Sequence, residues 1–137
     1  MDLITKAKEL MFQQTKKNQA PAWLLTELAI EKGKQLAKRH NVDETLLLTS
    51  LYLAHTYFTD GSYKSIRSDH PEKSAEFVKP YLDEWNVNEQ DQNIILNAIE
   101  AHHNKVPTTS KLAEVMKNAE CFKFLTVKGA LITLHEY

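Results

Sequence analysis

The sequence predicts an all-α fold, a single compact domain of about six helices spanning residues 1–137. The chain has only three glycines and four prolines, so residues that interrupt helices are few. Its apolar residues recur at helical spacing rather than in alternation. With 137 residues, of which 42% are apolar, the chain is long enough for one hydrophobic core and short for two.

The first three helices follow from apolar periodicity and from residues that open helices. Residues 3–11 carry a one-sided apolar stripe, which predicts the first helix. Pro21 suits the first turn of a second helix that runs to about His40, because the N–H that proline lacks is unpaired there. Asp43 is a suitable N-cap for a third helix. Residues 46–54 are apolar on nearly every face, so we expect this helix at the centre of the domain.

A polar segment separates the third helix from the fourth. Residues 58–69 form the longest irregular stretch of the sequence, and long loops in compact domains are often functional. Asp69 or His70 can cap the fourth helix. Pro80 is expected to end or kink it, because proline breaks the hydrogen-bond ladder of a helix.

Polar residues also mark the start of the last helices. Asn88, with an acidic residue three positions later, resembles a capping box and opens a fifth helix that should end near Asn104. Thr109 or Ser110 opens a sixth helix, and a short segment follows Gly129.

Charge and cysteine content narrow the classes of partner. Seventeen basic and eighteen acidic residues give a net charge of −1, so we expect neither a nucleic-acid nor a membrane partner. The N-terminus lacks the apolar core of a signal peptide, and the single cysteine, Cys121, fits a reducing compartment. A cytoplasmic location is therefore expected, while the oligomeric state stays open.

Four histidines and one glutamate fall where side chains from several helices can converge. His55 ends the predicted third helix, His70 starts the fourth, His102 and His103 end the fifth, and Glu120 lies in the sixth. Element ends bring side chains to one pocket while the helices behind them stay rigid. Neutral imidazoles and carboxylates are common ligands of Mn, Fe, Co, Ni and Zn, and such a metal lowers the pKa of bound water.

Each of these residues also has a purely structural interpretation. His55 can be a helix C-terminal histidine favoured by the helix dipole, and His70 a residue of a capping turn. His102 lies on the apolar face and is either a hydrogen-bonded core histidine or a ligand. His103 lies about 100° further round the helix, as a flanking residue or a substrate contact. For Glu120, the structural alternative is a solvated position.

Taken together, these segments resemble the HD superfamily of metal-dependent phosphohydrolases. Residues 43–55 resemble the helix that leads to the family's His-Asp pair, and residues 69–75 its second histidine element. Residues 99–103 resemble the third element, and residues 118–120 stand where the family has Ala-Asp. The resemblance covers residues 21–125 and implies an HD-domain-like fold.

The resemblance implies a catalytic metal centre. The implied metal ligands are His55, His70, His102 and Glu120. Their metal would be Mn, Fe, Co, Ni, Zn or Mg, and the ring nitrogens of the three histidines should converge to within roughly 5 Å of one point. The residues assigned to catalysis are Asp69, as a further carboxylate, and Lys64, Arg67 and His103, which would steady a phosphate. The implied function is hydrolysis of a nucleotide or another phosphoester.

Two departures from the family pattern keep a second hypothesis open. The family's first histidine would fall near Leu25 or Thr26, where Glu27 is the nearest potential ligand. Thr56 stands in place of the aspartate that follows the motif histidine. The alternative is therefore a catalytically inactive HD-like binding or regulatory module.

Overall fold

The computed structural model describes residues 1–18, 23–57, 70–103 and 105–136. Within these ranges the chain forms seven helices and no strand, so the predicted all-α fold is confirmed. The helices are α1 Leu3–Asn18, α2 Trp23–His40, α3 Glu44–Leu53, α4 His70–Glu84, α5 Glu89–Ala101, α6 Lys111–Leu125 and α7 Val127–Glu136.

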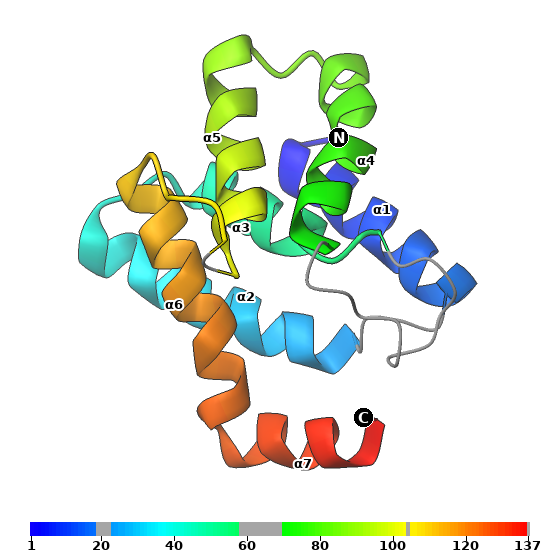
Figure 1. Ribbon diagram of the computed structural model, residues 1–137, viewed down its shortest axis with the longest axis vertical. Coiled ribbons are helices and arrows are strands. Elements are labelled where there is room, and N and C mark those ends of the chain that lie inside the picture. Colours follow the sequence, from blue (N-terminus) through cyan, green and yellow to red (C-terminus); the bar gives the residue numbers. More distant parts are fainter. Residues whose placement is uncertain (19–22, 58–69, 104, 137) are drawn as a thin grey trace.

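Helix α3 is the centre of the fold, as its sequence predicts. All of its residues from Leu46 to Leu53 are buried, and it packs against α1, α2, α4, α5 and α6 (Figure 1). Gly33 lets α2 approach closely, because a Cβ added there would lie 2.6 Å from the Leu51 Cδ1 atom. Burial of leucine side chains such as these stabilises the fold by about 1.5–3 kcal/mol each.

Three predicted helix starts are confirmed by their capping hydrogen bonds. The side chains of Asp43, Asn88 and Ser110 each accept a hydrogen bond from the backbone N–H three residues later, at 2.9–3.0 Å. Such a cap satisfies one of the otherwise unpaired N–H groups of a first turn. These caps fix where α3, α5 and α6 begin.

Helices α4 and α5 form an antiparallel pair (Figure 1). Both helices end at positions that differ from the prediction. Of the two outcomes expected at Pro80, an end or a kink, the end is wrong, because α4 continues through Pro80 to Glu84. Pro80 is on the exposed side, whereas Val78 and Leu82 are fully buried, so packing of the inner face keeps the helix going. Helix α5 ends at Ala101, earlier than expected.

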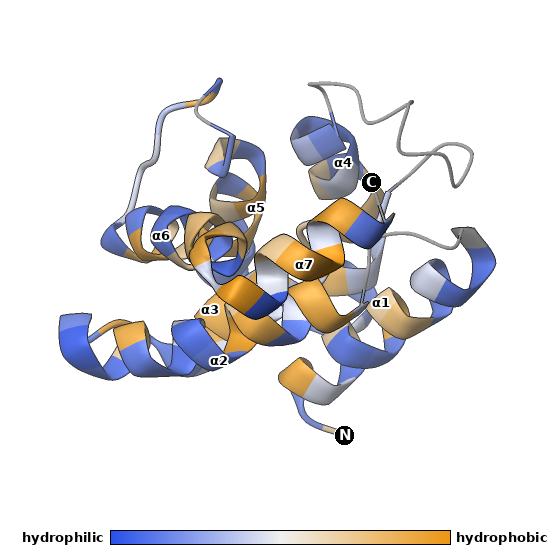
Figure 2. Ribbon diagram, turned by 90° about the horizontal axis from the view of Figure 1, so that it is seen from below, coloured by the Kyte–Doolittle hydropathy of each residue, from blue (hydrophilic) through white to orange (hydrophobic). Residues whose placement is uncertain are grey.

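The C-terminal segment forms a complete helix, α7, that packs against α6 and α2. Gly129 lies inside this helix rather than before it, so that part of the prediction is also wrong. A Cβ at Gly129 would lie 1.7 Å from the Lys123 carbonyl oxygen, so only glycine allows the sharp turn from α6 to α7. Hydrophobic side chains remain exposed on α7, at Val127, Leu131 and Leu134. The hydropathy colours of Figure 2 show that much of this helix is hydrophobic.

Candidate metal centre

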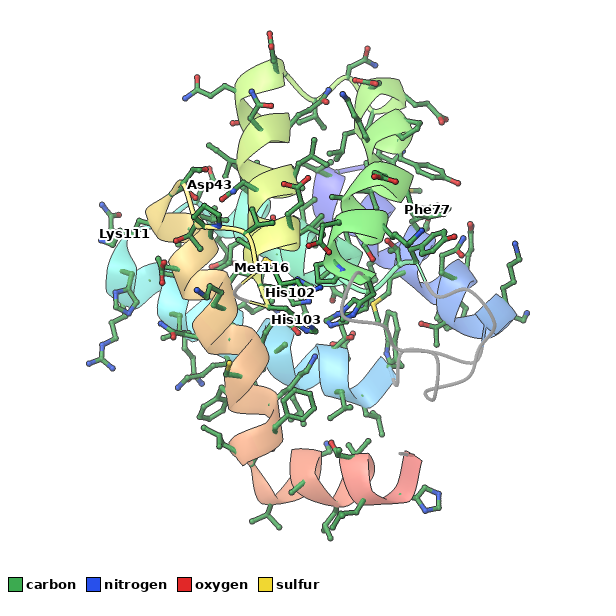
Figure 3. All side chains as sticks on the ribbon, in the orientation of Figure 1. Asp43, Phe77, His102, His103, Lys111 and Met116 are labelled. Carbon is green, nitrogen blue, oxygen red and sulfur yellow. The ribbon has the colours of Figure 1, made fainter. Side chains whose placement is uncertain are left out.

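Three helices bring four histidines together beside α6. His55 lies just after α3, and His70 is the first residue of α4. His102 and His103, which are labelled in Figure 3, follow the last residue of α5. His55, His70 and His102 are buried, with 8%, 6% and 4% of their surface exposed, while His103 is exposed. These four residues are called the histidine cluster below.

The spacing of the three buried rings fits a single metal ion. Their centroids lie 5.2 Å apart for His55 and His70, 5.0 Å for His55 and His102, and 5.3 Å for His70 and His102. A metal–nitrogen bond is about 2 Å long, so two imidazoles at a tetrahedral angle have centroids about 5 Å apart. The potential ligand atoms of all four histidines lie within 4.8 Å of one another. The expected convergence of the ring nitrogens is therefore present.

His103 belongs to the same group of rings. Its ring centroid lies 4.4 Å from that of His70 and 4.4 Å from that of His102. The sequence interpretation assigns His103 to a flank or a substrate contact, but its position also makes it a possible fourth ligand. Because it is the exposed member, it forms the solvent side of the cluster.

The hydrogen bonding of His102 shows which of its nitrogens can bind a metal. Its Nδ1 lies within hydrogen-bond distance of the Ile99 carbonyl oxygen, which can only accept, so Nδ1 carries the proton. The lone pair is then on Nε2, which is buried and has no hydrogen-bond partner among the residues described. A buried acceptor of this kind is unusual in a folded protein and fits a metal ligand.

Burial keeps the cluster in the form that binds metals. Desolvation lowers the pKa of His102 to about 4, although nearby Glu120 opposes the shift. Desolvation, followed by the charge of Lys123, holds the pKa of His55 well below its ordinary value. Burial also lowers the pKa of His103. These three imidazoles are therefore neutral near pH 7, with a lone pair available to a cation.

The segment after α3 is held by two hydrogen bonds. Thr56, at the position where the HD resemblance implies an aspartate, is fully buried, and its hydroxyl donates to the Leu53 carbonyl oxygen at 2.9 Å. The backbone N–H of Tyr57 donates to the Ser74 hydroxyl at 3.3 Å. Ser74 lies one helical turn after His70, so this bond ties the end of α3 to the start of α4.

A buried ion pair on α6 borders the cluster. The Glu120 Oε2 atom lies 2.7 Å from Lys123 Nζ and 3.4 Å from His55 Nε2. Both Glu120 and Lys123 are only 5% exposed. Sequence reasoning missed Lys123, although its spacing of three residues from Glu120 places both on one side of a helix. A cavity of about 80 Å³ adjoins the pair, lined by His55, His102, His103, Glu120, Cys121, Lys123 and Phe124.

The remaining sequence candidates are Lys64, Arg67, Asp69 and Glu27. Lys64, Arg67 and Asp69 lie outside the described residues. Glu27, the nearest candidate for the family's first ligand position, instead accepts a hydrogen bond from the Tyr52 hydroxyl at 3.5 Å, and it lies 3.9 Å from Lys8 Nζ. These two contacts place the Glu27 carboxylate beside α3 and α1.

Comparisons with models of protein families, with curated proteins and with solved structures found no match to the chain. None of the helices that the structure describes combines the length and the hydropathy needed to cross a membrane.

The arrangement can hold one divalent transition metal. Its candidate ligands are imidazoles, of which at least three are neutral near pH 7, and Glu120 is balanced by Lys123. Imidazole suits Zn, Cu, Fe and Ni, whereas Mg prefers oxygen ligands. Neutral ligands leave the full charge of the metal in place, so the site would attract an anion.

Proposed function

We propose that the chain is a divergent HD-superfamily protein that uses a divalent metal to hydrolyse a nucleotide or another phosphoester. The observation that carries this proposal is the convergence of His55, His70 and His102, buried and at the spacing of three ligands of one metal. The order of these histidines along the chain resembles that of the family. Together they support a metal-binding site.

The residues of the site divide into ligands and substrate contacts. His55, His70 and His102 hold the metal, and His103 is either a fourth ligand or a contact for the substrate. A divalent metal bound to imidazoles supplies Lewis acidity, polarising a phosphoryl oxygen and lowering the pKa of water. Lys64 and Arg67 belong to the segment next to His70 in sequence, and their charges suit a phosphate.

The choice of a phosphoester follows from charge. Because the imidazoles are neutral and the Glu120–Lys123 pair has no net charge, a bound divalent ion keeps its positive charge. A phosphate group is an anion that binds such a centre through its oxygens. An uncharged substrate gains less from the same site.

A metal-binding module without catalysis is the second candidate. It is favoured by Thr56, whose hydroxyl donates to Leu53 and which cannot supply the anionic ligand of the family's aspartate. It keeps the histidine cluster and its metal but has no turnover.

Two successive measurements distinguish the phosphohydrolase from the metal-binding module. Metal content is determined for protein purified without added metal, beside a His55→Ala, His102→Ala double variant. We expect about one metal per wild-type chain and none in the variant, and a metal-free wild type overturns both candidates. Metal-loaded protein is then assayed with a panel of nucleotides and phosphomonoesters. Hydrolysis that the double variant lacks supports the enzyme, whereas no turnover of any substrate leaves the module.

A further inference from the structure

Glu120 holds an unusual position beside the histidine cluster. It stands where the resemblance implies a metal-ligating carboxylate, yet it is not among the four residues whose ligand atoms lie within 4.8 Å of one another. Its Oε2 atom instead lies between Lys123 Nζ, at 2.7 Å, and His55 Nε2, at 3.4 Å. The carboxylate thus faces one of the histidines.

Resting on the metal centre proposed above, we propose that Glu120 is a positioning residue that holds His55 and is not itself a metal ligand. A neutral imidazole carries one N–H and one lone pair. When the Nε2–H of His55 donates to Glu120, the lone pair is on Nδ1, and His55 binds the metal through that atom. A carboxylate that orients a metal-bound histidine in this way raises the basicity of the imidazole.

Lys123 keeps Glu120 in this role. The two side chains are each 5% exposed, and a buried charge is tolerated only when it is paired. If Glu120 turned away to bind a metal, the Lys123 ammonium would lose its partner at 2.7 Å. The ion pair therefore opposes the movement that direct ligation would require. Because the ion pair keeps the Glu120 carboxylate away from the metal, the positive charge of the metal stays uncompensated.

The ligand role and the positioning role differ in what a cobalt(II) spectrum reports. Visible absorption bands of cobalt(II) depend on the atoms bound to the metal, and a titration gives the affinity at the same time. Removing a ligand changes the bands, whereas removing a positioning residue changes mainly the affinity. Outer partners of this kind alter metal affinity by about 10–100-fold.

The experiment compares two double variants that both remove the ion pair. Glu120→Gln, Lys123→Met keeps a side-chain oxygen that can accept from His55, and Glu120→Ala, Lys123→Met does not. Both avoid leaving one buried charge alone, and circular dichroism checks that they are folded. His102→Ala is the control for the loss of a ligand.

We expect the alanine double variant to bind cobalt(II) about 10–100-fold more weakly than the wild type, with band positions and intensities unchanged. The glutamine double variant should recover part of the affinity. Bands that shift in both double variants, as they should in His102→Ala, identify Glu120 as a ligand and overturn the inference. Unchanged affinity in both also overturns it. A wild type that binds no cobalt(II) refutes the metal centre itself, which is a separate outcome.

A second measurement needs no variant. In zinc-loaded protein, nitrogen-15 resonances of the histidine rings should show His55 bound through Nδ1 and protonated at Nε2. His102 should show the reverse, because its Nδ1 faces the Ile99 carbonyl oxygen. A zinc complex in which His55 binds through Nε2 overturns the inference.

Discussion

Acid should destabilise the metal-free protein because His102 is buried in its neutral form. Its pKa falls from the ordinary histidine value of 6.5 to about 4 in the fold. Between these values the unfolded chain binds a proton that the folded chain excludes. The contribution of neutral His102 to the free energy of unfolding is therefore complete above pH 6.5, and it is lost as the pH falls toward 4.

The size of this effect follows from the two pKa values. Because of the pKa shift of His102, the free energy of unfolding should be about 2 kcal/mol lower at pH 5 than at pH 7.5. His55 shifts in the same direction and adds to the loss. His102→Asn removes the titrating group while keeping an amide N–H that can donate to Ile99.

The assay is urea unfolding at pH 7.5, 6 and 5 with a chelator present, for the wild type and for His102→Asn. We expect the wild type to lose about 2 kcal/mol more than the variant between pH 7.5 and 5. Equal losses in the two proteins would refute the reasoning, because they would show that His102 is not held neutral by the fold.

Three further substitutions test separate parts of the structure. Gly129→Ala should lower the unfolding free energy by about 1–3 kcal/mol, measured by urea unfolding, because its Cβ would clash with the Lys123 carbonyl oxygen. Asp43→Ala should cost about 1 kcal/mol in the same assay through loss of the α3 cap. Thr56→Asp should tighten divalent-metal binding, measured by calorimetric titration, and lower metal-free stability by about 1–3 kcal/mol, because a carboxylate is then buried beside the cluster.

Each substitution has its own contradicting outcome. A Gly129→Ala protein as stable as the wild type would show that the α6–α7 turn accepts a side chain. Asp43→Asn is the control for the cap, since it keeps an accepting oxygen. An equal loss in Asp43→Asn and Asp43→Ala would assign the effect to charge instead. Unchanged metal affinity in Thr56→Asp would place this position outside the reach of the metal.

The sequence predicted most of the helical framework because helix starts and buried faces leave local signals. The caps at Asp43, Asn88 and Ser110 are chemical features of one residue and its next turn. Pro80 and Gly129 misled the prediction because tertiary packing overrode their local preference. At Pro80 the buried inner face of α4 sustains the helix, and at Gly129 the close approach of the Lys123 carbonyl oxygen requires glycine inside α7.

The site was predictable in part for a similar reason. His55, His70 and His102 stand at helix ends, and a helix end is visible in a sequence, so their convergence could be expected. The burial of Lys123 could not, because its periodicity shows only that it shares a side of α6 with Glu120. Whether the Glu120 carboxylate faces a metal or another side chain depends on contacts between helices.

Anomalous diffraction from crystals soaked in zinc or manganese tests the histidine cluster most directly. We expect a single strong peak about 2 Å from ring nitrogens of His55, His70 and His102. Glu120 should remain on Lys123, without contact to the peak. Crystals that take up the metal only at other positions, or not at all, would contradict the account.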